Sequence, residues 1–177
     1  MNPRRQFLKA STLLGAALFA GSGFAQLSPA AAATPPSANP KTPVRLPALG
    51  PELVRTFVVA AHGDLAKTQA MLAEEPHLLN ATWDWGGGDF ETALGGASHM
   101  GRRDIALFLL GQGARLDIFA ATMLGYLNVV EAVLTVRPDA LKCPGPHGIP
   151  LVVHAQKGGA EAATVLAYLQ KLTARPA

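Results

Sequence analysis

Histidine is the residue type in this chain with the most chemical potential, and two of the five histidines occupy related positions. His62 and His99 each lie at a predicted junction between two helices. If those helix pairs stack, the two side chains come within about 10 Å, the usual distance between packed helices. Zinc, however, needs three or four converging ligands, and the sequence has no His-Glu-x-x-His motif. We therefore predict structural roles for the histidines, with no metal site and no cofactor.

Nucleophilic catalysis has little support from the residue pattern. Ser98 and His99 are adjacent on a predicted helix, where consecutive side chains diverge by about 100°. A triad of Ser98, another histidine and Asp104 remains an alternative without a supporting motif. The run from Gly86 to Gly88 lacks the lysine and following helix of a phosphate-binding loop. The sequence thus predicts a protein that is not an enzyme, and a small metal-dependent or hydrolytic enzyme is the alternative.

The clearest functional signal is an aromatic loop. Both tryptophans of the chain and one phenylalanine lie between residues 82 and 91. Because aromatic residues are enriched at interface hot spots, we predict that this loop binds a protein partner, with one tryptophan packed and one exposed. The alternative is that the loop serves packing alone. The candidate binding residues are Trp83, Asp84, Trp85, Asp89, Phe90, Glu91, His99, Arg102 and Arg103.

The element that positions these residues is a helix pair after the loop. Small residues dominate the segment Thr92–Met100, which predicts a helix pressed against neighbours on two sides. Gly101 breaks this helix, and Arg102–Gln112 continues with apolar residues at i, i+3 and i+4 spacing. Gly113 follows where a helix C-terminus favours positive φ. The pattern predicts two short antiparallel helices.

This segment closely resembles one ankyrin repeat, whose pattern is Thr-Pro-Leu-His-x-Ala-Ala, a glycine, and a paired-leucine helix that ends in Gly-Ala. Two positions depart from it: Ala93 replaces the proline, and Gly95 replaces a histidine that normally bonds between repeats. The matching positions are Thr92, Leu94, Ala97, Gly101, Ile105, Leu109, Leu110, Gly113 and Ala114.

Related segments occur along the rest of the chain. Turn glycines at 63, 101, 125 and 158 are separated by 38, 24 and 33 residues, against about 33 for an ankyrin unit. In this family a β-turn segment called a finger leads from one helix pair into the next. The first interval therefore contains an enlarged finger, and the second lacks one. The adjacent glycines Gly158 and Gly159 suggest that the turn glycine of the last unit is shifted by one residue. The resemblance implies an all-α solenoid of about four helix-turn-helix repeats with irregular fingers, at about 52–80, 90–116, 117–142 and 149–172. It also implies that His154 bonds the backbone.

The N-terminus has the composition of an export signal. Arg4-Arg5 precedes Phe7-Leu8-Lys9 and an apolar run of 15 residues that is too short to span a membrane, which takes about 20. It resembles a twin-arginine signal over residues 1–25, cleaved after Ala25 or Ala33; a retained anchor is the alternative. Residues 26–51 are rich in proline and alanine and predict an extended linker before the domain at 52–172.

Without the signal, twelve basic and twelve acidic residues remain. The basic excess therefore belongs to the signal and does not indicate binding to nucleic acid or to a membrane surface. Cys143 is the only cysteine, so no internal disulfide forms; we predict a small buried residue, with a reactive thiol or intermolecular bridge as the alternative.

Together these features predict a periplasmic or secreted bacterial protein that binds an unidentified protein partner. The export route suggests an accessory or protective partner of a periplasmic enzyme. A self-associating structural module is a further alternative, and the sequence leaves the oligomeric state open.

Overall fold

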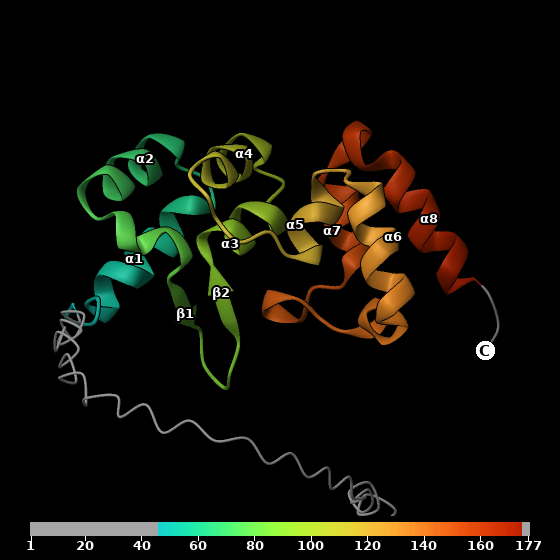
Figure 1. Cartoon of the computed structure of the whole chain (residues 1–177), viewed down its shortest axis with the longest axis horizontal. Helices are drawn as coiled ribbons and strands as arrows, with labels where there is room; N and C mark the ends of the chain where they lie inside the picture. The colour runs from blue at the N-terminus through green and yellow to red at the C-terminus, as the bar shows by residue number, and fades with distance from the viewer. Residues whose placement is uncertain (1–45, 175–177) are drawn as a thin grey trace, which may run out of the picture. The chain divides into compact units, whose positions relative to one another are not determined.

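In the computed structural model, the described residues 46–174 form eight α-helices and one β-hairpin (Figure 1). The predicted signal and residues 26–45 of the predicted linker lie outside the described residues. The helices are α1 (Pro51–Ala61), α2 (Leu65–Glu74), α3 (Ala93–His99), α4 (Arg103–Gly111), α5 (Ile118–Met123), α6 (Leu127–Val136), α7 (Leu151–Lys157) and α8 (Ala163–Thr173). The strands are β1 (Thr82–Asp84) and β2 (Phe90–Thr92), and short 3-10 turns cover Pro76–Asn80, Pro138–Lys142, Pro146–Gly148 and Gly159–Ala162.

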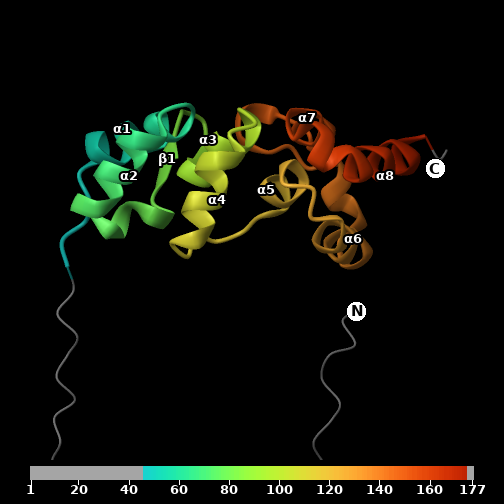
Figure 2. The ribbon, with the colours of Figure 1, turned by 90° about the horizontal axis from the view of Figure 1, so that it is seen from above.

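The helices come in consecutive antiparallel pairs, as the sequence predicts. Helices α1, α3, α5 and α7 contact one another in succession, and α3 also contacts α7. Helices α2, α4 and α6 form a second row (Figure 2). The described part of the chain is therefore mostly helical, with the enlarged finger as its only sheet. No helix in residues 46–174 is long and apolar enough to cross a membrane.

Helix α3 lies at the centre of the inner row. All of its residues from Ala93 to His99 are buried, because α1 packs on one side and α5 and α7 on the other. The small side chains of α3 allow this close contact, as predicted from its composition. Thr92 begins the helix by accepting a hydrogen bond from the Gly95 backbone N–H at 3.0 Å, a typical N-cap.

The turn glycines are confirmed in part. Gly113 follows α4 with φ +94°, as predicted, because a residue without Cβ adopts this conformation at no steric cost. Gly125 has φ +78° and lies directly against the Glu161 carbonyl, where a side chain has no room. In the last turn the left-handed residue is Gly159, with φ +62°. The expected glycine, Gly158, instead ends α7 with φ −71°.

The buried apolar residues form two clusters, one in each half of the described chain. The N-terminal cluster centres on Phe57, Leu94, Ile105 and Leu109, all nearly or fully buried. The C-terminal cluster contains Val130, Leu151, Val165 and Leu169. Helix α5 contributes to both clusters, so the two halves share one short helix as their apolar link.

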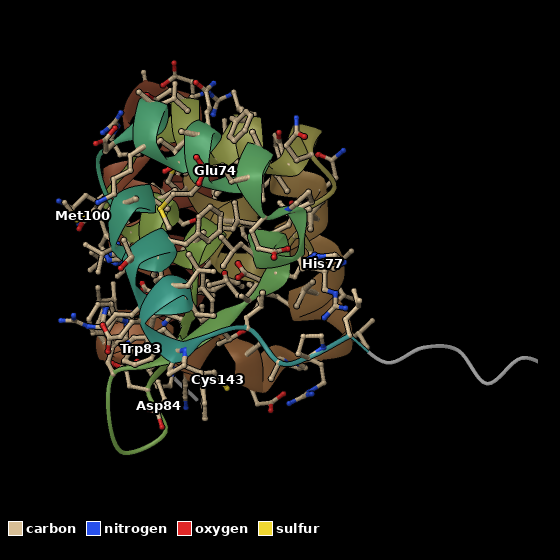
Figure 3. The ribbon with its side chains drawn as sticks, turned by 90° about the vertical axis from the view of Figure 1, so that its left-hand side faces the viewer. Glu74, His77, Trp83, Asp84, Met100 and Cys143 are labelled. Carbon is tan, nitrogen blue, oxygen red and sulfur yellow. The ribbon has the colours of Figure 1, made fainter. Side chains whose placement is uncertain are left out.

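The fingers differ strongly in length. The first is an antiparallel hairpin in which Thr82 pairs with Thr92 and Asp84 with Phe90. Figure 3 labels Trp83 and Asp84 on this hairpin, which extends beyond the helices. Residues 112–117 connect α4 to α5 without any strand, in agreement with the short interval between Gly101 and Gly125. The segment before α7 then extends back toward β2 (Figure 1).

Candidate metal centre

Three histidines and one glutamate converge between the hairpin and the inner helices. His62 follows α1, Glu91 is the central residue of β2, His99 ends α3, and His147 belongs to the turn before α7. One ligand atom from each side chain lies within 4.8 Å of all the others. The sequence analysis anticipated only the approach of His62 to His99, and the prediction of purely structural histidines did not foresee this cluster.

Glu91 is the centre of the group. Its side chain is fully buried and lies on the face of β2 opposite to its two neighbours in the strand. Its Oε2 atom accepts a hydrogen bond from the Trp85 Nε1–H at 2.8 Å. The same oxygen lies 3.3 Å from His62 Nε2 and 3.4 Å from His147 Nε2. A carboxylate this deeply buried requires positive charge close to it.

The second oxygen of Glu91 has no hydrogen-bond partner among the described residues. His99 Nε2 lies only 2.9 Å from this Oε1 atom, but the two groups are not aligned for a hydrogen bond. His99 Nε2 is also 3.1 Å from His62 Nε2. Since a buried acceptor without a donor is costly, the geometry leaves a place for a positive species among these atoms.

The outer nitrogens of two histidines fix where their protons lie. His62 Nδ1 is 2.8 Å from the Val58 carbonyl oxygen, and His147 Nδ1 is 2.8 Å from Asp89 Oδ2. Both acceptors lack protons, so each Nδ1 carries an N–H that it donates outward. In the neutral rings the Nε2 lone pairs therefore point toward Glu91. Histidine ligands of metals typically donate their other N–H in this way, often to a carboxylate.

The distances agree with a single coordination sphere. Zinc bonds nitrogen and oxygen at about 2.0–2.2 Å in a tetrahedron, which separates neighbouring ligand atoms by about 3.3–3.5 Å. Four of the separations at the centre run from 2.9 to 3.4 Å, and all four ligand atoms lie within 4.8 Å of one another. Three imidazoles and one carboxylate suit zinc, copper, nickel or iron, whereas calcium and magnesium prefer sites made of oxygen. The residues present therefore fit a first-row transition metal.

The backbone around His147 holds its ring in place. His147 has φ +57° and is the only non-glycine with positive φ in residues 46–174. Asp89 stabilises this conformation by accepting a second hydrogen bond, from the His147 backbone N–H, at 2.8 Å. A side chain of the hairpin thus holds the turn that precedes α7, and the two apolar halves meet at the cluster.

In the absence of metal, the direction of the His62 pKa shift favours a proton on this side chain. The contact with Glu91 raises the pKa of His62 above its usual 6.5, outweighing burial, which lowers it. Burial would raise the pKa of Glu91, but the contacts with His62, His99 and Trp85 together lower it well below 4.5. The metal-free cluster therefore favours a protonated His62 beside an ionised Glu91.

These shifts predict opposite pH profiles with and without metal. The raised His62 pKa stabilises the metal-free fold below about pH 6.5, and this contribution disappears as the pH rises through the folded value. The lowered Glu91 pKa contributes above about pH 4.5. In EDTA, the melting temperature should therefore fall between pH 6 and 8. With excess ZnCl2 it should rise over the same range, because protons compete with metal. Identical slopes would contradict metal binding here.

Glycines in α3 make room for the site. A Cβ on Gly96 would lie 2.8 Å from the His62 ring, and a Cβ on Gly95 would lie 3.3 Å from the Glu91 side chain. Gly95 is the position where the ankyrin pattern has histidine. The small-residue composition of this segment was thus the visible sequence signal of the cluster.

Substitution of Gly96 tests this packing. Gly96→Ala should weaken zinc binding by roughly 10- to 100-fold, the usual effect of disturbing the support of a metal ligand, because it displaces the His62 ring. Helix propensity alone would favour alanine by about 1 kcal/mol. Competition with a chromophoric chelator measures the affinity. Gly111→Ala in α4 is the matched control, since its added Cβ meets nothing within 4 Å; equal affinity of both variants would argue against the site.

The other predicted binding residues have local partners. Neither tryptophan is exposed, because both pack against the N-terminal cluster; the expectation of one exposed tryptophan was wrong. Asp84 Oδ1 accepts hydrogen bonds from two backbone N–H groups of the hairpin loop. Phe90 is the exception, with 61% of its surface exposed.

The two arginines after α3 also bond within the chain. Arg102 pairs with Asp104 at 2.7 Å and donates to the Gly63 carbonyl. Arg103 donates to the Leu124 carbonyl at 3.0 Å. Both side chains therefore connect neighbouring helix pairs.

Three further expectations have clear outcomes. Ser98 is buried and donates to the Leu94 carbonyl at 2.6 Å, so its hydroxyl is directed into its own helix. His154 Nδ1 bonds the Pro150 carbonyl at 3.1 Å, as the resemblance implied. Cys143 is exposed, which contradicts the predicted buried role; it follows a surface 3-10 turn that places its side chain outside both apolar clusters.

Comparisons with protein-family models, curated proteins and solved structures found no match.

Proposed function

We propose that this protein binds one divalent transition-metal ion, with zinc as the best fit, through His62, Glu91, His99 and His147. The observation that carries the proposal is the convergence of three imidazole Nε2 atoms on one buried carboxylate at 2.9–3.4 Å. Two of the imidazoles direct their Nδ1 protons outward, toward Val58 and Asp89. This arrangement favours a cation at the centre.

The number of protein ligands favours a structural role for the metal. Structural zinc sites use four protein ligands, whereas catalytic sites keep one position for water or substrate. Here three ligands come from the N-terminal half, and His147 comes from the turn before α7. A bound ion would therefore link the two halves. An enzyme is the alternative and would require one ligand to leave the metal.

Metal analysis of the purified full chain tests the proposal. We expect one zinc per chain, and we expect Co²⁺ to replace it with the intense visible absorption of a tetrahedral site. A double variant, Glu91→Gln with His147→Ala, should lose both signals. Equal metal content and an unchanged cobalt spectrum in this variant would overturn the proposed site.

We also propose that the scaffold is an ankyrin-type solenoid. This is supported by four consecutive helix pairs, by fingers of very unequal length and by left-handed glycines at three of the inter-helix turns. Its stability would then be a sum of repeat and neighbour terms. Circular dichroism of chains truncated after α6 and after α4 tests this: graded loss of helix supports a repeat array, whereas complete loss on the first truncation argues against it.

Export and partner binding remain proposals that rest on the sequence. Arg4-Arg5 and the apolar run after it support export to the periplasm, where the protein would act as an accessory or protective partner of an enzyme. Cell fractionation of the full chain and of an Arg4→Lys, Arg5→Lys variant tests the export route. Equal periplasmic amounts of both chains would contradict a twin-arginine signal.

A further inference from the structure

A groove of about 620 Å³ lies between the hairpin loop and the turn before α7. Its volume falls within the range of about 300–1,000 Å³ typical of ligand sites. The missing finger explains it, because the short connection from α4 to α5 leaves the space between the two neighbouring fingers open. The metal-binding side chains themselves do not line this groove, so it is a separate feature of the surface.

The walls of the groove are mainly apolar. Phe90 from β2 and Phe119 from α5 contribute rings, and Pro144 and Pro146 form the facing wall. Phe90 is 61% exposed, which is costly for a side chain of this size unless a partner covers it. Several lining positions are glycines, so backbone groups are accessible there. The groove therefore favours an apolar ligand that also makes main-chain hydrogen bonds.

The charge of the groove is negative. Asp89 and Asp117 line it, and none of the described lining residues is basic. Asp117 Oδ1 caps α5 by accepting the Ala120 N–H at 2.7 Å, whereas both oxygens of Asp89 already bond His147, so Asp117 is the carboxylate that a ligand would meet. Cations are attracted by such carboxylates and also by the faces of phenylalanine rings. An anionic ligand would be repelled.

Strand β2 presents alternate side chains to the groove, and its outer edge is partly used within the chain, because the Phe90 N–H donates to the Gly88 carbonyl at 3.1 Å and Thr92 caps α3. It pairs only with β1 in the described part of the chain, and its alternate residues Phe90 and Thr92 both line the groove. The turn before α7 lies on the same side (Figure 1). An extended peptide places alternate side chains in adjacent pockets, which matches the alternate lining positions Phe90 and Thr92.

We propose that this groove binds an extended segment of a partner protein in which basic residues alternate with apolar ones. The apolar side chains would contact Phe90 and Phe119, and a lysine or arginine would pair with Asp117. This proposal does not depend on the metal, because the Asp89–His147 hydrogen bonds hold the facing turn without it.

Fluorescence anisotropy with three labelled eight-residue peptides tests the proposal on the full chain. The first alternates lysine and leucine, the second replaces each lysine by glutamate, and the third replaces each leucine by serine. We expect the first peptide to bind at least tenfold more tightly than either of the others, in EDTA as well as in zinc. Equal binding of the three peptides, or no binding of the first, would overturn the proposal.

Variants locate the binding. Phe90→Ala and Asp117→Asn should each weaken the first peptide at least fivefold; asparagine retains the helix-capping oxygen. Val136→Ala on α6 is the control, because Val136 is an exposed apolar residue that does not line the groove. An equal loss in the control would indicate non-specific adsorption and contradict the assignment. Binding of free arginine amide as tight as that of the peptide would assign the groove to a small cation instead.

Discussion

Glu91→Gln should reduce zinc affinity by at least about 100-fold while the protein keeps its fold. Glutamine has nearly the same shape and still offers an oxygen to the Trp85 N–H, so the packing of β2 is maintained. It lacks the negative charge that compensates the cation, and a neutral amide is a poor zinc ligand. The loss should match or exceed the roughly 10- to 100-fold change that follows substitution of a residue bonded to a metal ligand, because Glu91 contacts all three histidines.

Isothermal titration with zinc measures this effect, and the chain supplies its own control. Glu75 also contacts a histidine, His77, at 2.7 Å, but on the surface and away from the cluster. Glu75→Gln should leave the zinc affinity unchanged. If Glu75→Gln weakened zinc binding as much as Glu91→Gln, the bound metal would reside elsewhere.

Zinc should raise the melting temperature of the wild-type protein by about 5–11 °C at a free concentration near 100 times Kd. A ligand that binds only the folded state contributes about 2.7 kcal/mol under these conditions. Each kcal/mol shifts the midpoint by about 2–4 °C for a chain of 150–250 residues. The ion should be effective because it joins the turn before α7 to the N-terminal half, whereas only α5 and Tyr126 contribute to both apolar clusters.

His147→Ala should abolish most of this increase. Thermal scans with and without zinc measure it, and His77→Ala is the matched control because His77 is an exposed histidine outside the cluster. The two variants should differ by several degrees in the presence of zinc and by much less in EDTA. A full zinc-induced shift in His147→Ala would show that the C-terminal half does not contribute to the site.

The pattern of helices was predictable because the signals are local. Helix α2 spans Leu65–Glu74, since Asp64 caps its start and Pro76 prevents its continuation. The small residues of α3 predicted its burial on two sides, and the unequal glycine intervals predicted one enlarged and one missing finger. Each of these features depends on residues within one or two turns of the chain.

The metal centre was not predictable in the same way. Its four ligands come from four different elements, so no pair has the short, regular spacing that identifies metal sites in sequence. Two further facts were needed: the left-handed conformation of His147, and the contact of α3 with α7 across the short third helix pair. Both depend on how the units stack.

The sequence alone therefore determined the helix pairs, their glycine turns and the irregular fingers, because capping, periodicity and backbone sterics act within a few residues. Only the tertiary structure decided which residues the loops between the helix pairs bring together. The connection from α4 to α5 contains no strand, a groove lies between the hairpin loop and the turn before α7, and this turn approaches the hairpin closely enough for His147 to reach Glu91. Residues distant along the chain converge there through the stacking of helices, which no local pattern encodes.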